Sequence, residues 1–535
     1  MASLRGTGSE LVLEVSHFGS VPLTASLPLL AFARDEDPYA ACRRVWETAL
    51  RSPAMAGVGG LREAKAYPRA FEYLGWCSFE QFKLAIDESN MTEVVRALAV
   101  SPVPVRWLLI DDGHLDDGCA DAIETQEGAT PSASNDPATR RLRRAGTHPQ
   151  RFPRGWGPLV SAARLTKIRW LGAWMNFNGY WGGIDPRGDW PEQVRAALVE
   201  IADGVSLPRG DINAAQTFWS HVLAPLAQAG FDFLKVDNQA GNLKLYAGQV
   251  PNGVAASMAN KVALEQIVSA RFGGRLINCM AHNGVASFQT PTSAVTRCSE
   301  DYKRDDAWRA KHHLHNSFGN MLWLGPTVWG DHDMFHSSDL VAAAAMACSK
   351  ALSGGPVYLS DHPRDFRSEL IMPLCLADGR VLRPEAPALP LPDSIFDDPY
   401  ESDRAYRVAA PLANGAVAVA CFNLATPDRC VTARIVPSDL QAARRMMPTA
   451  PNAAASHEII VLDQRARRVW PLREESRVTL APGEHALYTV APVHDGWAFL
   501  GSPDKLLGPA FIAELERHDN RCVIRVPEPG RVWVW

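Results

Sequence analysis

The sequence predicts an α/β protein built on a (β/α)8 TIM barrel, with a short N-terminal extension and a C-terminal antiparallel β-sandwich. Two observations carry this prediction. Between Tyr73 and Ser360, short apolar runs alternate with amphipathic helical patterns, which is typical of a parallel sheet covered by helices. Polar residues also follow almost every apolar run, as expected where the strand ends of a barrel surround one cup. A doubly wound open sheet is the competing architecture, but the chain has no G-x-G-x-x-G turn.

The barrel elements are expected in alternating order along the chain. Strands are predicted at Tyr73–Phe79, Arg106–Asp111, Ile168–Asn176, Phe231–Asp237, Leu276–His282, Ala294–Ser299, Met321–Val328 and Pro356–Ser360. Helices are predicted at Thr92–Val100, Trp156–Leu165, Ala214–Gln228, Ala255–Arg271, Ala307–His315 and Leu340–Leu352. On the fifth of these helices, His312, His313 and His315 are expected at the surface.

The chain divides into three predicted parts. Residues 1–70 form a short β/α segment, whose one helix starts where Asp37 can cap it and Pro38 suits its first turn. Residues 71–375 form the catalytic barrel, and residues 376–535 form the β-sandwich. The proline-rich stretch Arg383–Pro392 is expected to be a stiff linker between them. The polar stretch Cys119–Gln150 is interpreted as an insertion in the barrel, with a mobile lid as the alternative.

Composition excludes several classes of protein. The net charge is −5 and no long basic run occurs, which argues against a nucleic-acid partner. The apolar runs are too short to span a bilayer, so no membrane partner is expected. No signal-peptide pattern occurs at the start of the sequence, and the ten cysteines form no C-x-x-C pair, so we expect a cytoplasmic protein with buried thiols. His332 and His336, near Asp331 and Asp333, lack a further matching ligand, so no metal site is predicted.

Two carboxylates stand out as candidates for chemistry on a glycosidic bond, which needs one group to attack or activate water and one to protonate the leaving oxygen. Asp237 ends an apolar strand, with Lys235 two residues earlier on the same face, where its ammonium would keep Asp237 ionised. Asp301 follows the sixth predicted strand, four residues after Arg297. The alternative for each carboxylate is a strand-end cap or a surface ion pair.

A series of motifs follows the predicted strands of this region. In chain order they are Gly75-Trp-Cys-Ser-Phe, Leu109-Ile-Asp-Asp-Gly-His, Gly179-Tyr-Trp-Gly-Gly, Leu234-Lys-Val-Asp-Asn-Gln, Cys279-Met-Ala-His-Asn, Arg297-Cys-Ser-Glu-Asp, Asp331-His-Asp-Met-Phe-His-Ser and Gly354-Gly-Pro-Val-Tyr-Leu-Ser-Asp. This series resembles glycoside hydrolase family thirty-six, in its branch of raffinose synthases and alkaline α-galactosidases. Each motif alone is weak, but their order from about Tyr73 to Pro363 makes the resemblance specific.

The resemblance implies a retaining α-glycosidase, similar to an α-galactosidase, that acts on α-linked oligosaccharides. Asp237 would attack the anomeric carbon to form a covalent glycosyl-enzyme, while Asp301 serves as general acid and then as general base. The residues expected to bind the reacting sugar are Trp76, Asp111, Asp112, Trp181, Lys235, Cys279, Arg297 and Asp333. No metal or organic cofactor is expected. The expected partner is an oligosaccharide or glycoside, and a homo-oligomer is left open.

Three positions depart from the family pattern. His114, Phe79 and His332 stand where the motifs of the family carry tryptophan, which is expected to remove aromatic surface near the sugar. The identity of the sugar is therefore open, with α-glucose as one alternative. A transglycosylase of the raffinose-synthase kind is a further alternative, because it differs only in whether a sugar acceptor outcompetes water. A carbohydrate-binding protein without catalysis fits less well, since Asp237 and Asp301 are both intact.

Overall fold

A computed structural model of the chain describes residues 2–22, 30–118, 136–447, 458–518 and 521–535. Its centre is an eight-stranded parallel sheet in which seven consecutive pairs of neighbouring strands are hydrogen-bonded. In chain order the strands are β3 (Gly75–Cys77), β4 (Trp107–Ile110), β5 (Trp170–Asn176), β8 (Phe233–Asp237), β9 (Leu276–Asn278), β10 (Val295–Arg297), β11 (Trp329–Asp331) and β12 (Tyr358–Leu359).

The sheet closes on itself. Strand β12 pairs with β3 at one edge, and the remaining gap to β11 is bridged just beyond that strand, at Phe335. The backbone N–H of Phe335 donates to the carbonyl of Tyr358 at 3.2 Å, and that of Ser360 donates back to Phe335 at 3.0 Å. A closed ring of eight parallel strands is the barrel that the sequence predicts, so this prediction is confirmed.

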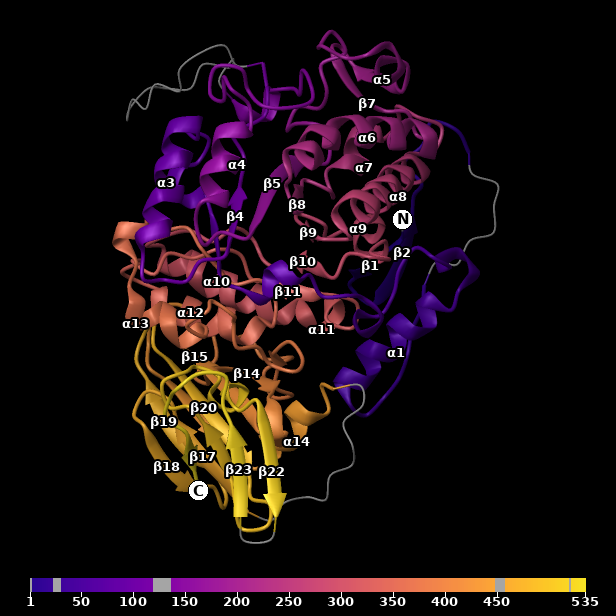
Figure 1. The fold of residues 1–535 in the computed structure, drawn as a ribbon. Coiled ribbons are helices and arrows are strands. Elements are labelled where there is room, and N and C mark those ends of the chain that lie inside the picture. The colour runs from indigo at the N-terminus through magenta and orange to yellow at the C-terminus, as the bar shows by residue number, and fades with distance from the viewer. Residues whose placement is uncertain (1, 23–29, 119–135, 448–457, 519–520) are drawn as a thin grey trace.

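Helices cover the outside of the barrel (Figure 1). All six predicted helices are present, as α3 (Glu88–Val100), α4 (Gly157–Arg164), α6 (Ile212–Ala229), α8 (Gly253–Phe272), α10 (Ala307–Gly319) and α12 (Ala343–Ser353). Their ends follow local chemistry. The side chain of Asp211 caps the start of α6, and the helix ends at Gly230 in the left-handed conformation. Shorter helices lie between the main elements, at α2 (Phe79–Phe82), α5 (Glu192–Ala196), α7 (Asn242–Tyr246), α9 (Gly284–Phe288) and α13 (Ser368–Ile371), and the hairpin β6 (Leu198–Ala202)–β7 (Val205–Pro208) lies between β5 and β8.

The strand predicted at Met321–Val328 is wrong. The first four of these residues form the helix α11 (Met321–Leu324), and the strand β11 begins only at Trp329. A short apolar run has no periodicity that separates a strand from a buried helix turn, and here Gly325 and Pro326 end the helix. The later start places Asp331 at the strand end, where it is fully buried.

Aromatic side chains fill the barrel interior, and two glycines make room for them. The rings of Trp107 and Phe233 meet edge to face, with centroids 5.3 Å apart. A Cβ atom at Gly75 would lie 2.0 Å from the Trp107 ring, and one at Gly172 would lie 2.1 Å from the Phe233 ring. The strands therefore carry glycine where the opposite residue projects a large ring across the barrel.

The C-terminal part is an antiparallel sandwich, as predicted. Its main sheet has six strands in the order β13 (Leu389–Pro390), β14 (Tyr406–Pro411), β15 (Val417–Phe422), β20 (His485–Pro492), β17 (Ile459–Asp463) and β18 (Arg468–Pro471). One face is covered by the ladder of β16 (Val431–Ile435) with β19 (Ser476–Leu480) and by the helix α14 (Ser438–Arg444). Two further pairs are β21 (Phe499–Gly501) with β24 (Trp533–Val534), and β22 (Glu514–His518) with β23 (Arg521–Arg525).

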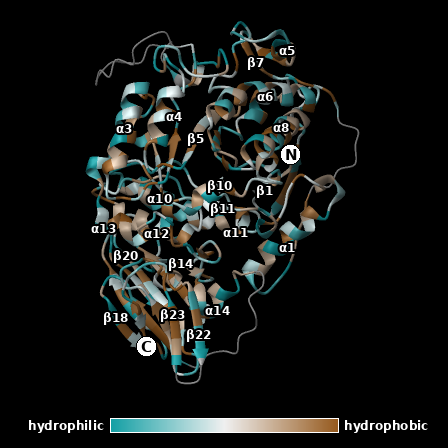
Figure 2. Cartoon of the chain, in the orientation of Figure 1, coloured by the Kyte–Doolittle hydropathy of each residue, from teal (hydrophilic) through white to brown (hydrophobic). Residues whose placement is uncertain are grey.

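This main sheet is buried on both faces, which joins it to the barrel. In β15, Ala418, Ala420 and Phe422 belong to the core shared with the barrel, while the alternate residues Val417 and Val419 belong to the separate sandwich core. Its strands are correspondingly hydrophobic along their length (Figure 2). The ring of Phe422 lies 5.7 Å from that of Phe318 on α10. The sandwich is thus packed against the helices on one side of the barrel.

The proline-rich stretch Arg383–Pro392 is not a free linker. Its residues Leu389 and Pro390 form the edge strand β13, and most of the stretch is buried. Proline is tolerated at a sheet edge because the missing N–H faces away from the ladder. Composition alone predicted a stiff linker, because it could not reveal the neighbouring strand β14 with which the segment pairs.

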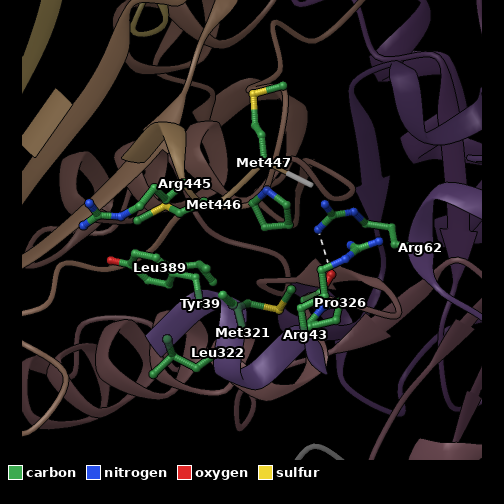
Figure 3. A pocket seen from close by; sticks show the side chains of 13 residues that line it. Tyr39, Arg43, Arg62, Met321, Leu322, Pro326, Leu389, Arg445, Met446 and Met447 are labelled. Carbon is green, nitrogen blue, oxygen red and sulfur yellow. Dashed lines mark hydrogen bonds between the residues drawn. The ribbon is translucent and has the colours of Figure 1, made fainter. Parts of the chain in front are cut away.

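The N-terminal part forms the hairpin of β1 (Ala2–Thr7) with β2 (Glu10–Val15) and the helix α1 (Pro38–Leu50), which Asp37 caps as predicted. A cavity of about 160 Å³ lies between α1, α11 and the end of α14 (Figure 3). Tyr39, Met321 and Arg62 are among its walls, and Arg62 donates from Nη1 to the Gly325 carbonyl at 2.7 Å. None of the predicted site residues lines this cavity.

Two further expectations from the sequence concern the insertion and the absence of membrane-spanning segments. Most of the insertion predicted at Cys119–Gln150, namely residues 119–135, lies outside the described residues. Within the described part of the chain, no helix combines the length and the apolar character needed to cross a bilayer.

Replacing Gly172 by Ala tests the packing inside the barrel. We expect Gly172→Ala to lower the free energy of unfolding by about 1–3 kcal/mol, because its methyl group would overlap the Phe233 ring. The measurement is urea-induced unfolding followed by fluorescence. The control is Gly157→Ala at the start of α4, where no atom lies within 4 Å of the added Cβ. Equal stability of the two variants would contradict this account of the barrel interior.

Candidate active site

Asp237 ends strand β8 and is held in place by two hydrogen bonds. The indole N–H of Trp174 donates to Oδ2 at 3.1 Å, and the backbone N–H of Asn238 donates to Oδ1 at 2.7 Å. Asn238 has φ +57°, a left-handed conformation that turns the chain sharply after the strand. The carboxylate, on a residue only 8% exposed, is therefore fixed on the rigid end of a barrel strand. Trp174 was not predicted as a site residue.

Lys235 forms a buried ion pair with Asp111. Its Nζ lies 2.8 Å from Asp111 Oδ2, and the Cys77 thiol donates to the same oxygen at 3.4 Å. Burial alone would lower the pKa of Lys235, but the Asp111 carboxylate, together with smaller effects of Cys279 and Cys77, holds the pKa well above its usual range. The expectation that this ammonium serves Asp237 directly is therefore incomplete, because its direct partner is a carboxylate on another strand.

Asp112 lies beside that pair and receives three hydrogen bonds. Tyr180 donates from its hydroxyl to Oδ1 and Trp181 from its indole N–H to Oδ2, both at 2.9 Å. The backbone N–H of Gly113 donates to Oδ1 at 2.7 Å. Burial raises the pKa of Asp112 to about 7, against the opposing effect of the bonds from Trp181 and Tyr180. Tyr180 is a partner that the sequence did not reveal.

Arg297, at the end of β10, contacts three carboxylates. It donates from Nε to Asp331 Oδ2 at 3.2 Å, from Nη1 to Asp301 Oδ1 at 3.0 Å, and from Nη2 to Asp333. The guanidinium is fully buried, and burial would lower its pKa, but neighbouring groups that include Asp333, the foremost, and Asp331 hold the pKa well above its usual range. A planar five-donor group suits such a cluster because it can serve several oxygens at once.

Asp333 is the most constrained of these carboxylates. It also accepts from the backbone N–H of Tyr302 at 2.8 Å and from the hydroxyl of Tyr358 at 3.2 Å. Burial would raise the pKa of Asp333, but the nearby Arg297 and Lys235 bring it down to about 2. The residue has φ +65°, an unusual backbone conformation for a residue with a side chain.

Asp301 differs from the others because it is accessible. Its side chain is 48% exposed, and its described ion pair is with Arg297, four residues earlier. Asp237 is largely buried and fixed, whereas Asp301 faces the solvent from a loop. The two predicted catalytic carboxylates thus have distinct environments.

Cys279 lies among the predicted groups. Its backbone N–H donates to the carbonyl of Val236 at 2.9 Å, which places it beside the end of β8. Burial raises the pKa of the Cys279 thiol well above its usual range, with Asp237 as the second cause and with smaller effects from Arg297, Lys235 and Asp301. Both predicted catalytic carboxylates therefore act on one buried thiol. The next residue, Met280, is 44% exposed and has φ +46°.

Trp76 stands apart from this cluster. Its side chain is fully buried, and its indole N–H donates to the carbonyl of Asp361 at 2.6 Å. Its ring packs against Phe82, with centroids 6.4 Å apart. The structure therefore brings the other seven predicted sugar-binding residues around two buried charge clusters, while a role for Trp76 in the pocket wall stays a prediction.

The two histidines that replace family tryptophans are both fully buried. The Nε2 atom of His114 lies 2.9 Å from the Trp174 carbonyl, and burial lowers its pKa to about 4. The Nδ1 atom of His332 lies 2.8 Å from the Ser349 hydroxyl. The expectation that these positions border the sugar stays a prediction.

The histidines of α10 do not all lie at the surface, contrary to prediction. His313 is almost fully buried, and burial lowers its pKa to about 3. It faces the loop that carries Asp301, and it contacts the equally buried Lys350 of α12. Neither residue carries a motif, so only the fold brings them to the site. Within the described residues, no group of three or more His, Cys, Asp or Glu side chains is arranged to hold a metal ion.

This arrangement can perform acid–base and nucleophilic chemistry on a polyhydroxylated substrate. A rigid carboxylate at Asp237 and an accessible one at Asp301 supply the two reactive groups that such chemistry needs. The clusters around Asp112 and Arg297 supply oriented charges that can bind hydroxyl groups. All of these groups stand at the carboxyl ends of the barrel strands, where barrel enzymes carry their active sites.

Comparison with solved structures agrees with the fold. The chain is similar to a β-L-arabinopyranosidase from Geobacillus stearothermophilus, with a TM-score of 0.53, 15% identity, and coverage of 80% of this chain and 99% of the other. It is also similar to an α-galactosidase from Saccharomyces cerevisiae, with a TM-score of 0.50, 12% identity, and coverage of 79% and 98%. At these identities the likeness concerns the fold.

Curated relatives are more similar in sequence. A probable galactinol–sucrose galactosyltransferase from Arabidopsis thaliana is 27% identical over 361 residues, which are 63% of this chain and 47% of the relative. A galactinol–sucrose galactosyltransferase from Pisum sativum is 25% identical over 557 residues, which are 92% of this chain and 69% of the relative. The chain therefore spans about half of the first relative and somewhat more of the second.

The family comparison is broader. The family described as raffinose synthase or seed imbibition protein Sip1 matches residues 36–407, which include every barrel strand and all the predicted site residues. This is the branch that the strand-end motifs resemble. Because the match covers well over half of the sequence, the chain belongs to the raffinose synthase or seed imbibition protein Sip1 family.

Proposed function

We propose that this protein is a retaining enzyme that cleaves α-galactosyl linkages in oligosaccharides or glycosides. The observation that supports the proposal is a buried, oriented Asp237 at the end of β8 together with an accessible Asp301 just after β10, both at the carboxyl ends of barrel strands. Membership of the raffinose synthase family and the names of the curated relatives support galactose as the transferred sugar.

In the proposed first step, a carboxylate oxygen of Asp237 attacks the anomeric carbon. The glycosidic C–O bond breaks, and Asp301 donates its proton to the departing oxygen, which leaves a covalent galactosyl-enzyme. Asp301, now ionised, takes a proton from a water molecule or an acceptor hydroxyl. That oxygen then attacks the same carbon and releases Asp237. Two displacements at one carbon retain its α configuration.

The remaining site residues are proposed to bind and orient the sugar. Asp111 with Lys235 and Asp112 with Trp181 form two polar pairs that can exchange hydrogen bonds with hydroxyl groups. Arg297 is proposed to hold Asp301 toward the leaving oxygen and Asp333 toward the ring. Cys279 is proposed to contact the ring with a neutral thiol. Because these groups are already fixed by the protein, binding costs little further ordering.

A second candidate function is transfer of the galactosyl group to a sugar instead of water. The observation that favours it is that the curated relatives are named galactosyltransferases. The first half of the reaction is identical for both outcomes. The choice depends on which acceptor reaches the galactosyl-enzyme first.

Removing either carboxylate tests the catalytic pair. We expect Asp237→Asn to lower turnover of an α-galactoside by several orders of magnitude, since an amide is a poor nucleophile. We expect Asp301→Asn to lower turnover of a substrate with a poor leaving group by about 10²–10⁴-fold. The control is Asp305→Asn, an exposed carboxylate of the same loop that accepts from the Leu340 N–H at 2.8 Å. Near-normal turnover of either catalytic variant would rule the mechanism out.

The configuration of the first product tests the retaining route. We expect α-galactose as the initial product of hydrolysis, because two inversions at one carbon restore its configuration. The measurement is proton NMR within the first minutes, before mutarotation. Sucrose added as an acceptor separates the two candidate functions: a transferase forms the trisaccharide at the expense of free galactose. A β-configured first product would exclude a covalent galactosyl-enzyme.

The raised pKa of Asp112 predicts a pH dependence. Below a pH of about 7 this carboxyl becomes protonated and loses acceptor capacity for a sugar hydroxyl. We therefore expect kcat/KM to fall as the pH is lowered through about 7. In Asp112→Asn this fall at acidic pH should disappear, and kcat/KM at higher pH should be lower than in the unchanged protein. An unchanged acidic limb in Asp112→Asn would assign the titration to another group.

A further inference from the structure

Lys350 is a fully buried cation that the proposed mechanism does not use. It lies on α12, behind strand β11, with no exposed surface. Its Nζ donates to the carbonyl of His332, lies 3.1 Å from His313 Nε2, and lies 3.8 Å from the Met346 sulfur. Within the described part of the chain, no carboxylate forms a direct ion pair with it. A buried ammonium without a direct counter-ion is costly and calls for an explanation.

Both ring nitrogens of His313 contact the backbone. Nε2 lies 2.8 Å from the His332 carbonyl and 3.1 Å from Lys350 Nζ. Nδ1 lies 3.0 Å from the Glu300 carbonyl and 3.2 Å from the Ser299 hydroxyl. Burial lowers the pKa of His313 to about 3, so the ring is neutral and has one N–H to donate. Lys350 and His313 therefore meet at the His332 carbonyl, and the other ring edge of His313 reaches the Glu300 carbonyl.

The two carbonyls that this pair contacts belong to peptide groups that precede site carboxylates. The His332 carbonyl belongs to the peptide that leads into Asp333, whose φ is +65°. The Glu300 carbonyl belongs to the peptide that leads into Asp301. One buried pair of side chains therefore holds the backbone on both sides of Arg297, which binds the two carboxylates.

The positive charge of Lys350 also affects the carboxylates around Arg297. Arg297 contacts three carboxylates, so its cluster has an excess of formal negative charge. Burial lowers the pKa of Lys350 to about 8, and Asp333 and Asp331 keep it from falling further. Lys350 is therefore still charged at neutral pH and offsets part of that excess from behind the strand.

We propose that Lys350 and His313 are positioning residues that hold the peptides before Asp301 and Asp333 and thereby set the direction of both carboxylates. The proposal rests on the proposed function, in which Asp301 protonates the leaving oxygen. Neither residue touches the substrate. Their loss is expected to impair proton donation by Asp301 and sugar binding by Asp333, while Asp237 keeps its own support from Trp174 and Asn238.

The test compares two substrates that differ in their need for an acid. Release of nitrophenolate from a nitrophenyl α-galactoside needs little protonation, whereas release of the sugar alkoxide from raffinose needs it fully. We expect Lys350→Met to lower kcat/KM for raffinose at least about tenfold more than for the nitrophenyl galactoside. A residue that only stabilises the fold would lower both values by the same factor. Equal losses on the two substrates, or no loss, would overturn the proposal.

The control is Lys311→Met on α10. Lys311 is also buried, but its Nζ bonds to the Ala425 carbonyl and to Asp428, away from the carboxylate cluster. Its loss should leave the ratio of the two kcat/KM values unchanged. A shift as large as that of Lys350→Met would show that the ratio responds to any buried lysine, which contradicts a specific role.

A second pair of variants keeps the proposal testable if Lys350→Met does not fold. His313→Leu removes the ring contacts with the Glu300 and His332 carbonyls, and His313→Asn retains a side-chain N–H. We expect the leucine variant to change the substrate ratio more than the asparagine variant, and the double variant Lys350→Met/His313→Leu to exceed the larger single effect only slightly. Equal ratios in the leucine and asparagine variants, or additive effects in the double variant, would contradict a shared role of the two residues.

The variant Asp301→Asn distinguishes a failure of the proposed function from a failure of the positioning role. If this variant discriminates between the substrates and Lys350→Met does not, the proposed function stands and the positioning role fails. If Asp301→Asn itself shows no discrimination, the proposed function fails, and the positioning role fails with it.

Discussion

The buried guanidinium of Arg297 is the interaction on which the site depends. A carboxylate transferred from water into a protein interior is strongly destabilised unless a charge or several donors compensate for it. Asp331 and Asp333 are fully buried, and both are paired with this one group. Because the same guanidinium reaches Asp301 in the solvent-exposed loop, it couples the accessible carboxylate to the buried ones. The cation that compensates the buried carboxylates therefore also holds Asp301.

Most of the architecture was predictable because each barrel element repeats one local pattern. The six long helices have amphipathic periodicity and clear ends, and most strands are apolar runs that end in polar residues. The exception, Met321–Val328, is an apolar run too short to carry a period, and the chain switches there from helix to strand within five residues. The prediction of a linker at Arg383–Pro392 failed for a related reason. Its pairing with β14 depends on the three-dimensional fold and leaves no signal in the local sequence.

The site was predictable only in part, because motifs identify residues and not their partners. Lys235 was placed beside Asp237 on sequence proximity, but its direct partner Asp111 is 124 residues away along the chain. Trp174 and Tyr180 orient site carboxylates through single hydrogen bonds that leave no pattern in a sequence. The partners of the two substituted histidines, the Trp174 carbonyl and the Ser349 hydroxyl, were equally invisible in the sequence. Knowing that a residue differs from its family does not reveal which way its side chain points.

The non-glycine residues with positive φ at the strand ends have a consequence for engineering. Asn238 follows Asp237 and Met280 follows Cys279, and such conformations cost on the order of 1–3 kcal/mol apiece. Glycine at these positions would relax the backbone and raise the melting temperature, yet it would free the loops that aim the reactive groups. Directed evolution for heat resistance would thus select substitutions at the positions where greater stability lowers turnover most.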